Sequence, residues 1–227
     1  MTERFIIDDF TMHITFEDVI KKLLLQDQDD IDQIEPLYKQ AEKIARPKAI
    51  CREAEVDEIA GDIVTIGGAT FRSAVMAENL KEVSKVFAYV VTCGVEVDSL
   101  SDGQGDYFVR LWLDMIKEMI LVDAMTQFAD IVCNKYGIEK YVTMNPGSGN
   151  ADVWPIAQQR PLFDLIGNVK KDSGVELTDS LLMVPMKTVS GILFPSDSGY
   201  NNCAVCTREN CPGRKVPYDP SLSYANN

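Results

Sequence analysis

Histidine is nearly absent from this 227-residue chain, since His13 is the only one. A single histidine argues against a histidine-based catalytic triad and against a histidine-rich metal site. Long apolar runs are also lacking, because no stretch approaches the roughly 20 residues that span a bilayer. Positive charge is scarce: 22 basic residues stand against 35 acidic ones, a formal net charge of -13. Such a surface repels phosphate backbones, so we expect no nucleic-acid partner, and the lack of a long apolar run predicts no membrane partner.

Targeting and repeat signals are missing as well. No stretch near residue 1 resembles a secretory signal, and no internal repeat or low-complexity segment is present. We therefore expect a cytoplasmic protein, in which stable disulfides are rare. The length suits one large domain or two small ones.

Cysteine, by contrast, is concentrated in one place. Three of the six cysteines, Cys203, Cys206 and Cys211, form a C-x-x-C-x-x-x-x-C pattern in a polar segment with asparagine, proline and glycine. Cysteines that pack as small hydrophobic residues do not cluster in polar loops, whereas thiolates that share a metal do. The pattern predicts an iron–sulfur cluster or a zinc ion. A disulfide pair with one spare thiol, or three incidental surface cysteines, are the alternatives.

Three thiolates leave one coordination position open. Zinc would take a fourth protein ligand or water, and a cluster would take a fourth thiolate or leave one iron open. The candidates for the fourth ligand are Cys51, Cys93, Cys133 and His13. The sequence does not choose among them.

Periodicity predicts mixed helices and strands without strict β–α–β alternation, which favours an α+β fold with a largely antiparallel sheet packed with helices. Thr15, with Asp18, is expected to cap the first helix. The expected elements, in chain order, are a short strand and a helix within residues 1–30, a helix at 29–45, a hairpin at 49–66, a helix at 74–80, a strand at 86–92, a long helix at 106–136, a strand at 141–144, one or two helices from Trp154 to Ile166, and strands at 181–184 and 189–194.

Helix ends and helix faces are also predicted from the sequence. Gly137 is expected to end the long helix as a left-handed cap, and Asp152 is expected to cap the helix at Trp154. On the long helix, an apolar stripe that includes Phe108, Leu111 and Val122 is expected to face the core. The opposite face carries Asp114, Lys117, Glu118 and Asp130 and is expected to face solvent.

Two glycine-containing segments follow the long helix. The first is Asn145-Pro146-Gly147-Ser148-Gly149, directly after a predicted strand, and the second runs from Thr178 to Ser190-Gly191. Glycine permits positive φ and close approach of a ligand to the backbone. The first segment is neither a P-loop nor a G-x-G-x-x-G motif. Either segment alone would be read as an ordinary turn or strand.

Taken together, in this order and spacing, the segments resemble the reactivation domain of cobalamin-dependent methionine synthase. That family has a Pro-Gly-Tyr loop after a strand, then a helix, then a Leu-Thr-Glu-Ser segment and a Ser-Val-Ser-Gly segment. The resemblance covers about residues 142–200, and Tyr200 matches a family tyrosine near the ligand. It implies a cleft for S-adenosylmethionine lined by Asn145, Pro146, Gly147, Ser148, Gly149, Ser190, Gly191 and Tyr200.

The sequence departs from the family at two points of the first loop. The family has an arginine three positions before the proline and a tyrosine after the glycine, where this chain has Thr143 and Ser148. A threonine hydroxyl does not replace a bidentate guanidinium–carboxylate pair, which puts binding of S-adenosylmethionine in question. Arg72, Arg160 or Arg214 are the candidate substitutes.

The resemblance implies a free-standing reactivation module, spanning residues 1–200, with an added cysteine segment at 201–227. Its expected role is to restore an oxidised cobalt(II) corrinoid carried by a methyl-transfer partner protein, with the cysteines holding a redox centre. One alternative is a non-catalytic module that binds the corrinoid protein or S-adenosylmethionine and carries a structural zinc knuckle. Another is a methyltransferase that uses S-adenosylmethionine without a corrinoid.

Overall fold

The computed structural model describes residues 2–101, 105–150, 152–211 and 213–220. Its centre is a seven-stranded sheet with the strand order β4-β3-β2-β5-β9-β6, in which β1 pairs with β2 and every pairing is antiparallel. The strands of this sheet are β1 (Arg4–Ile7), β2 (Lys48–Ala60), β3 (Ile63–Ile66), β4 (Ala69–Arg72), β5 (Lys85–Thr92), β6 (Tyr141–Met144) and β9 (Thr188–Pro195). The α+β fold predicted from sequence is therefore confirmed.

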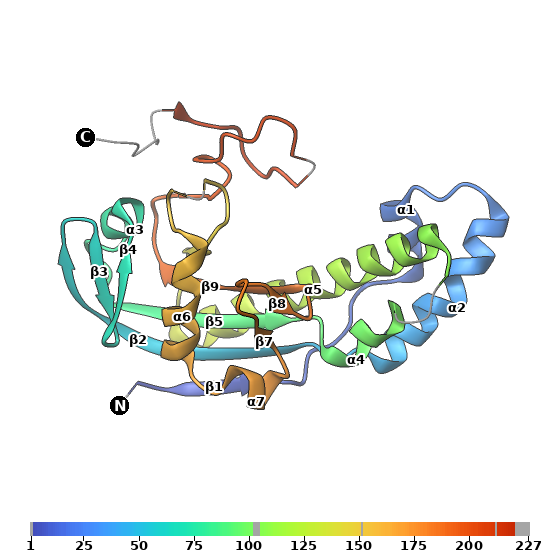
Figure 1. Ribbon diagram of the computed structural model, residues 1–227, viewed down its shortest axis with the longest axis horizontal. Coiled ribbons are helices and arrows are strands. Elements are labelled where there is room, and N and C mark those ends of the chain that lie inside the picture. Colours follow the sequence, from blue (N-terminus) through green and yellow to red (C-terminus); the bar gives the residue numbers. More distant parts are fainter. Residues whose placement is uncertain (1, 102–104, 151, 212, 221–227) are drawn as a thin grey trace.

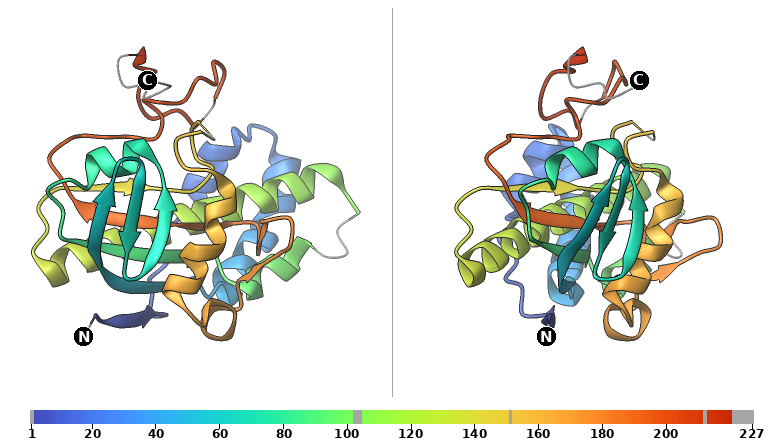
Figure 2. Two further views of the ribbon diagram at one scale, coloured as in Figure 1. Left: turned by 60° about the vertical axis from the view of Figure 1, so that its left-hand side comes forward. Right: turned by 90° about the vertical axis from the view of Figure 1, so that its left-hand side faces the viewer.

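Helices cover both faces of this sheet (Figures 1 and 2). The long helix α5 lies behind it in Figure 1 and packs with α1 and α2, whereas α6 and α7 lie in front. The helices are α1 (Phe16–Leu23), α2 (Gln28–Ile44), α3 (Ala74–Asn79), α4 (Val95–Asp98), α5 (Tyr107–Tyr136), α6 (Gln159–Ile166) and α7 (Val169–Ser173), with short 3-10 turns η1 (Ser99–Ser101) and η2 (Ile156–Gln158).

Strand β5 explains why two cores form. Its side chains alternate, so that Phe87, Tyr89 and Val91 join the core beneath α5, while Ala88 and Val90 join the core beneath α6. A strand buried on both faces reads as a continuous apolar run, which is how this segment appears in the sequence. The predicted buried strand is confirmed.

Local capping also follows the sequence. The Thr15 side chain accepts a hydrogen bond from the backbone N–H of Asp18, and the Asp18 carboxylate accepts one from the backbone N–H of Thr15. Gly137 ends α5 with φ 67 and ψ 37, the left-handed conformation expected of it. The hairpin of β2 and β3 is likewise confirmed.

The predicted faces of α5 are partly wrong. Phe108, Leu111 and Val122 are exposed, and Lys117 is only 4 % exposed. Its Nζ donates to the Asp98 carboxylate at 2.9 Å and to the Asp98 backbone carbonyl at 2.8 Å. A 30-residue helix that touches the sheet, α4 and the N-terminal helices at different points has no single buried stripe.

Two further predictions need correction. Asp152 caps no helix: the η2 turn begins at Ile156 and α6 at Gln159, neither with a side-chain cap. The strand expected at 181–184 shrinks to β8 (Met183–Val184), which pairs with β7 (Glu176–Leu177) in a separate two-stranded sheet. The 178–182 chain closes instead as a turn, with the Leu182 N–H bonded to Thr178 Oγ1.

Candidate functional site

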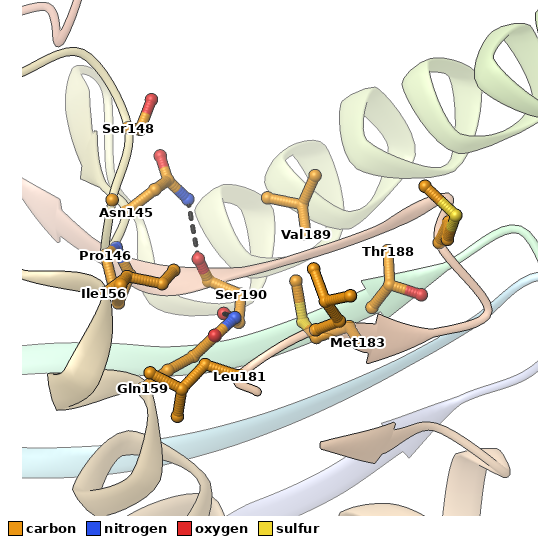
Figure 3. Close-up of a pocket in the computed structure, with 13 residues that line it drawn as sticks. Asn145, Pro146, Ser148, Ile156, Gln159, Leu181, Met183, Thr188, Val189 and Ser190 are labelled. Atoms are coloured by element: carbon orange, nitrogen blue, oxygen red, sulfur yellow. Dashed lines mark hydrogen bonds between the residues drawn. The ribbon is translucent and has the colours of Figure 1, made fainter. Parts of the chain in front are cut away.

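A cleft of about 490 Å³ lies where β6 ends against β9. Figure 3 shows its walls, with Asn145, Pro146 and Ile156 at one end and Thr188 and Met183 at the other. The lining residues are Asn145, Pro146, Gly147, Ser148, Ile156, Gln159, Leu181, Leu182, Met183, Met186, Thr188, Val189 and Ser190. None of these described lining residues is charged, so the cleft suits a neutral, partly apolar group.

Asn145 connects the elements around the cleft. Its Nδ2 donates to the Ser190 backbone carbonyl at 2.9 Å, the bond drawn in Figure 3, and to the Tyr89 hydroxyl at 2.8 Å. Its Oδ1 accepts from Asn202 Nδ2 at 3.0 Å. Burial raises the pKa of Tyr89 well above its ordinary value, so this hydroxyl stays protonated. One amide therefore joins β6, β5, β9 and the C-terminal segment.

Gln159 is a wall residue that sequence reasoning missed. It is the first residue of α6 and is 2 % exposed. Its Nε2 donates to Ser190 Oγ at 3.1 Å, while its Oε1 has no hydrogen-bond partner among the residues that the structure describes. No sequence pattern marks it, because a glutamine in the first turn of a helix is ordinarily a surface residue.

A second hollow, of about 290 Å³, adjoins the cleft at Asn145 and Val189 and lies between the sheet edge and α5. Thr143, which the resemblance places where the family has an arginine, lines it. The single charged residue among its described lining residues is Lys215, from the C-terminal segment. A cation thus reaches the neighbourhood of Thr143 from a part of the chain that sequence comparison did not suggest.

The three arginines considered as substitutes lie elsewhere. Arg72 pairs with Asp62. Arg160 donates to the Asp179 backbone carbonyl at 2.9 Å, and Arg214 is engaged by backbone carbonyls of the cysteine segment. None of the three lines either hollow among the described residues.

Of the eight residues predicted to hold a ligand, the structure brings Asn145, Pro146, Gly147, Ser148 and Ser190 into the cleft wall. The other three have different surroundings. Tyr200 packs against the core beneath α6.

Two of those three are glycines at close backbone approaches. A Cβ on Gly149 would lie 2.5 Å from the Asn202 carbonyl oxygen, and one on Gly191 would lie 2.3 Å from the Met144 carbonyl oxygen. Glycine at these positions lets the C-terminal segment meet the loop and lets β6 meet β9. Their ligand role stays a prediction.

The cysteine segment folds back onto the loop that follows β6, and Figures 1 and 2 show both on the same edge of the molecule. Arg214 organises it by donating to the backbone carbonyls of Cys203 at 2.9 Å and Cys206 at 3.2 Å, and also to that of Arg208. The Cys203 Sγ accepts the Lys215 backbone N–H at 3.5 Å. These bonds organise the segment internally, and the bond from Asn202 to Asn145 joins it to the loop at the cleft.

The described residues contain no group of three or more histidine, cysteine or acidic side chains placed to hold a metal ion. Cys51 and Cys93 lie in the core beneath α5, where burial raises the pKa of Cys93 to about 12 and that of Cys51 further. Cys133 lies on α5, and His13 pairs with Asp123. As arranged here, none of the candidate fourth ligands completes a site with the three C-terminal cysteines.

An antiparallel sheet with helices on both faces places this chain in the α+β class, and a neutral cleft lies at the sheet's edge. The chain resembles the crystal structure of the MetH reactivation domain bound to AdoHcy, with a TM-score of 0.62 and 16 % identity, over 88 % of this chain and 80 % of that one. At this identity the likeness establishes the fold.

Residues 128–213 match the family described as the activation domain of vitamin B12 dependent methionine synthase. The resemblance predicted from residues 142–200 is thereby confirmed. No match was found among the curated proteins. Within the described residues, no helix is long and apolar enough to cross a membrane.

Proposed function

We propose that this protein reactivates a corrinoid-carrying methyl-transfer protein and binds the adenosyl ligand of that reaction in the cleft. The observation that carries the proposal is the coincidence of cleft and family match. Every lining residue, from Asn145 to Ser190, lies inside the matched stretch 128–213. The structural relative was crystallised with AdoHcy, which is S-adenosylmethionine without its methyl group.

The cleft suits the adenosine part of such a ligand. Its volume of about 490 Å³ lies in the ordinary range for small-molecule sites. Leu181, Met183 and Val189 offer apolar contact to a flat base, and Ser190 and Gln159 offer polar groups. The role of these residues is to bind and orient the ligand and to exclude water around it.

The amino-acid part of the ligand needs a cation, because a carboxylate in a neutral cleft is poorly stabilised. Lys215 is the charged side chain that lines the adjoining hollow, and among the described residues no carboxylate forms an ion pair with it. We place the ligand carboxylate near Lys215. An ammonium is a point charge without the fork geometry of arginine, so this contact supplies charge more than orientation.

The proposed reaction has two steps. Cobalt(II) on the partner protein accepts one electron from an external reductant and becomes cobalt(I). Cobalt(I) then takes the methyl group from the sulfonium of S-adenosylmethionine, which leaves as AdoHcy, and methylcobalt(III) results. The corrinoid carries this chemistry, while the protein supplies binding and orientation.

The partner must bring its corrinoid to this face. Leu182, Val184 and Met186, on and beside β8, are exposed, and Met186 is 75 % exposed at the edge of the cleft. The net charge of -13 favours a partner with a basic docking surface. Both proteins are proposed to meet in the cytoplasm.

The cysteine segment carries a separate proposal. Cys203, Cys206 and Cys211 are proposed to bind an iron–sulfur cluster or zinc once the segment rearranges, on the strength of their spacing and polar surroundings. No step of the reaction above depends on this centre. The test is the iron, sulfide and zinc content of anaerobically purified protein, with an electron paramagnetic resonance spectrum after reduction.

Stoichiometric iron and sulfide, lost in Cys206→Ala, would support a redox centre. Zinc alone would favour the structural knuckle of a binding module. Absence of all three from the wild-type protein would refute a metal role for the segment.

Cobalt chemistry tests the main proposal. The probe is the cobalamin-binding module of a methionine synthase in its cobalt(II) state, mixed with titanium(III) citrate and S-adenosylmethionine and followed by visible absorbance. We expect methylcobalamin to form faster with this protein than without it. Asn145→Ala should lose most of the effect, because it removes the amide that joins β6, β9 and Tyr89.

Asn79→Ala is the control, since Asn79 bonds the Val75 carbonyl on α3, outside the cleft. No acceleration by the wild-type protein would refute the proposed function.

A further inference from the structure

The side-chain oxygen Oε1 of Gln159 lies buried at the cleft without a hydrogen-bond donor among the described residues. The residue is 2 % exposed, and its Nε2 is already committed to Ser190 Oγ at 3.1 Å. Oε1 is buried, and no described residue donates a hydrogen bond to it. Buried polar atoms are almost always hydrogen-bonded, so this one calls for a donor that arrives with a ligand.

The character of the cleft limits what that donor can be. No described lining residue is charged, so nothing there would balance an ammonium group. Leu181, Met183 and Val189 form apolar walls suited to a flat ring. A neutral N–H at the edge of a planar base meets both conditions.

We infer that Gln159 Oε1 accepts a hydrogen bond from the exocyclic amino group of an adenine base seated in the cleft. Gln159 is then the residue that makes the site selective for adenosyl over inosyl ligands. The inference rests on the proposed function and deepens it. Inosine has a carbonyl oxygen in place of that amino group, which would face Gln159 Oε1 as acceptor against acceptor. A site that hydrogen-bonds a ligand group rejects the analogue that lacks it, since its own buried group is left unpaired.

The experiment compares the Kd of AdoHcy with that of S-inosylhomocysteine by isothermal titration calorimetry. The wild-type protein should prefer AdoHcy by about tenfold or more, the usual consequence of one buried unpaired group. Gln159→Leu should bring the two values together by weakening AdoHcy binding. Gln159→Glu keeps a carbonyl-type acceptor and should retain a preference for AdoHcy. This second variant keeps the inference testable if Gln159→Leu does not fold.

Gln158→Leu is the matched control. Gln158 is the preceding residue, but its amide bonds the backbone of Arg72 and it does not line the cleft. This variant should keep the wild-type preference.

Equal affinities in the wild-type protein, or an unchanged preference in folded Gln159→Leu, would overturn the inference and leave the proposed function standing. Equal affinities are the result expected if a ribose hydroxyl is the donor, because both ligands carry the same ribose. Failure of the wild-type protein to bind either ligand would overturn both.

Discussion

Gly191→Ala is the substitution for which the structure makes its strongest prediction. An added Cβ would lie 2.3 Å from the Met144 carbonyl oxygen, 2.5 Å from Asn145 Nδ2 and 3.0 Å from the Tyr89 hydroxyl. The first neighbour is backbone, so no side-chain rotation relieves the clash. Strand β6 must move away from β9, or the Asn145 side chain must leave its place.

The expected loss of stability can be assembled from these contacts. Overpacking a tight site costs typically about 1–3 kcal/mol. Losing the Asn145 bonds to Ser190 and Tyr89 adds about 1 kcal/mol each if both break. Since both effects arise from the same shift, we expect a loss of about 3 kcal/mol, which corresponds to a Tm lower by about 6–12 °C for a chain of this size.

Differential scanning calorimetry and urea unfolding measure this change. Gly105→Ala is the control, because a Cβ there meets no atom of the described residues within 4 Å, and its Tm should stay close to the wild-type value. A Tm for Gly191→Ala within about 2 °C of wild type would refute the packing argument. If AdoHcy binding fell at the same time, Gly191 would be a ligand residue, as the sequence predicted.

Three other predictions concern charged side chains. Asp98→Asn should cost about 2 kcal/mol, because it removes the carboxylate that lies 2.9 Å from the buried Lys117 ammonium, whereas Lys117→Met removes the buried charge together with that bond and should cost less; chemical denaturation compares the two. The hydrogen bond from Lys85 holds the pKa of Glu53 below 4.5, so its contribution is complete above about pH 4.5 and is lost as pH falls through the lowered pKa. Glu53→Gln should flatten the stability curve in that acidic range, and an equally steep curve would contradict this. Arg214→Ala should speed alkylation of the C-terminal cysteines without changing Tm, and unchanged thiol reactivity would count against its organising role.

Local signals in the sequence were sufficient for two helix ends and for one buried strand. Thr15 with Asp18 and Gly137 specify helix ends through bonds and backbone conformations within one turn. The run from Val86 to Val91 indicated a strand buried on both sides.

Predictions that depend on packing partners were less successful. The prediction of which face of α5 meets solvent was partly wrong, because Lys117 is buried and pairs with Asp98 of another element. The strand expected before Pro185 is shorter than predicted, because β8 pairs only with the short strand β7 and does not join the main sheet. Neither partner is recognisable from the periodicity of the segment itself, since pairing and burial depend on residues outside that segment.

The cleft divides in the same way. The sequence by itself predicted that Asn145–Ser148 and Ser190 come together, because two motifs in a fixed order carry the family resemblance, and the structure places them in one cleft. Only the tertiary structure decided that Gln159 forms the wall and that Lys215 lines the hollow beside Thr143. Antiparallel pairing of β6 with β9 brings the motifs together, while α6 and the C-terminal segment reach the site by packing, which no short stretch of sequence encodes.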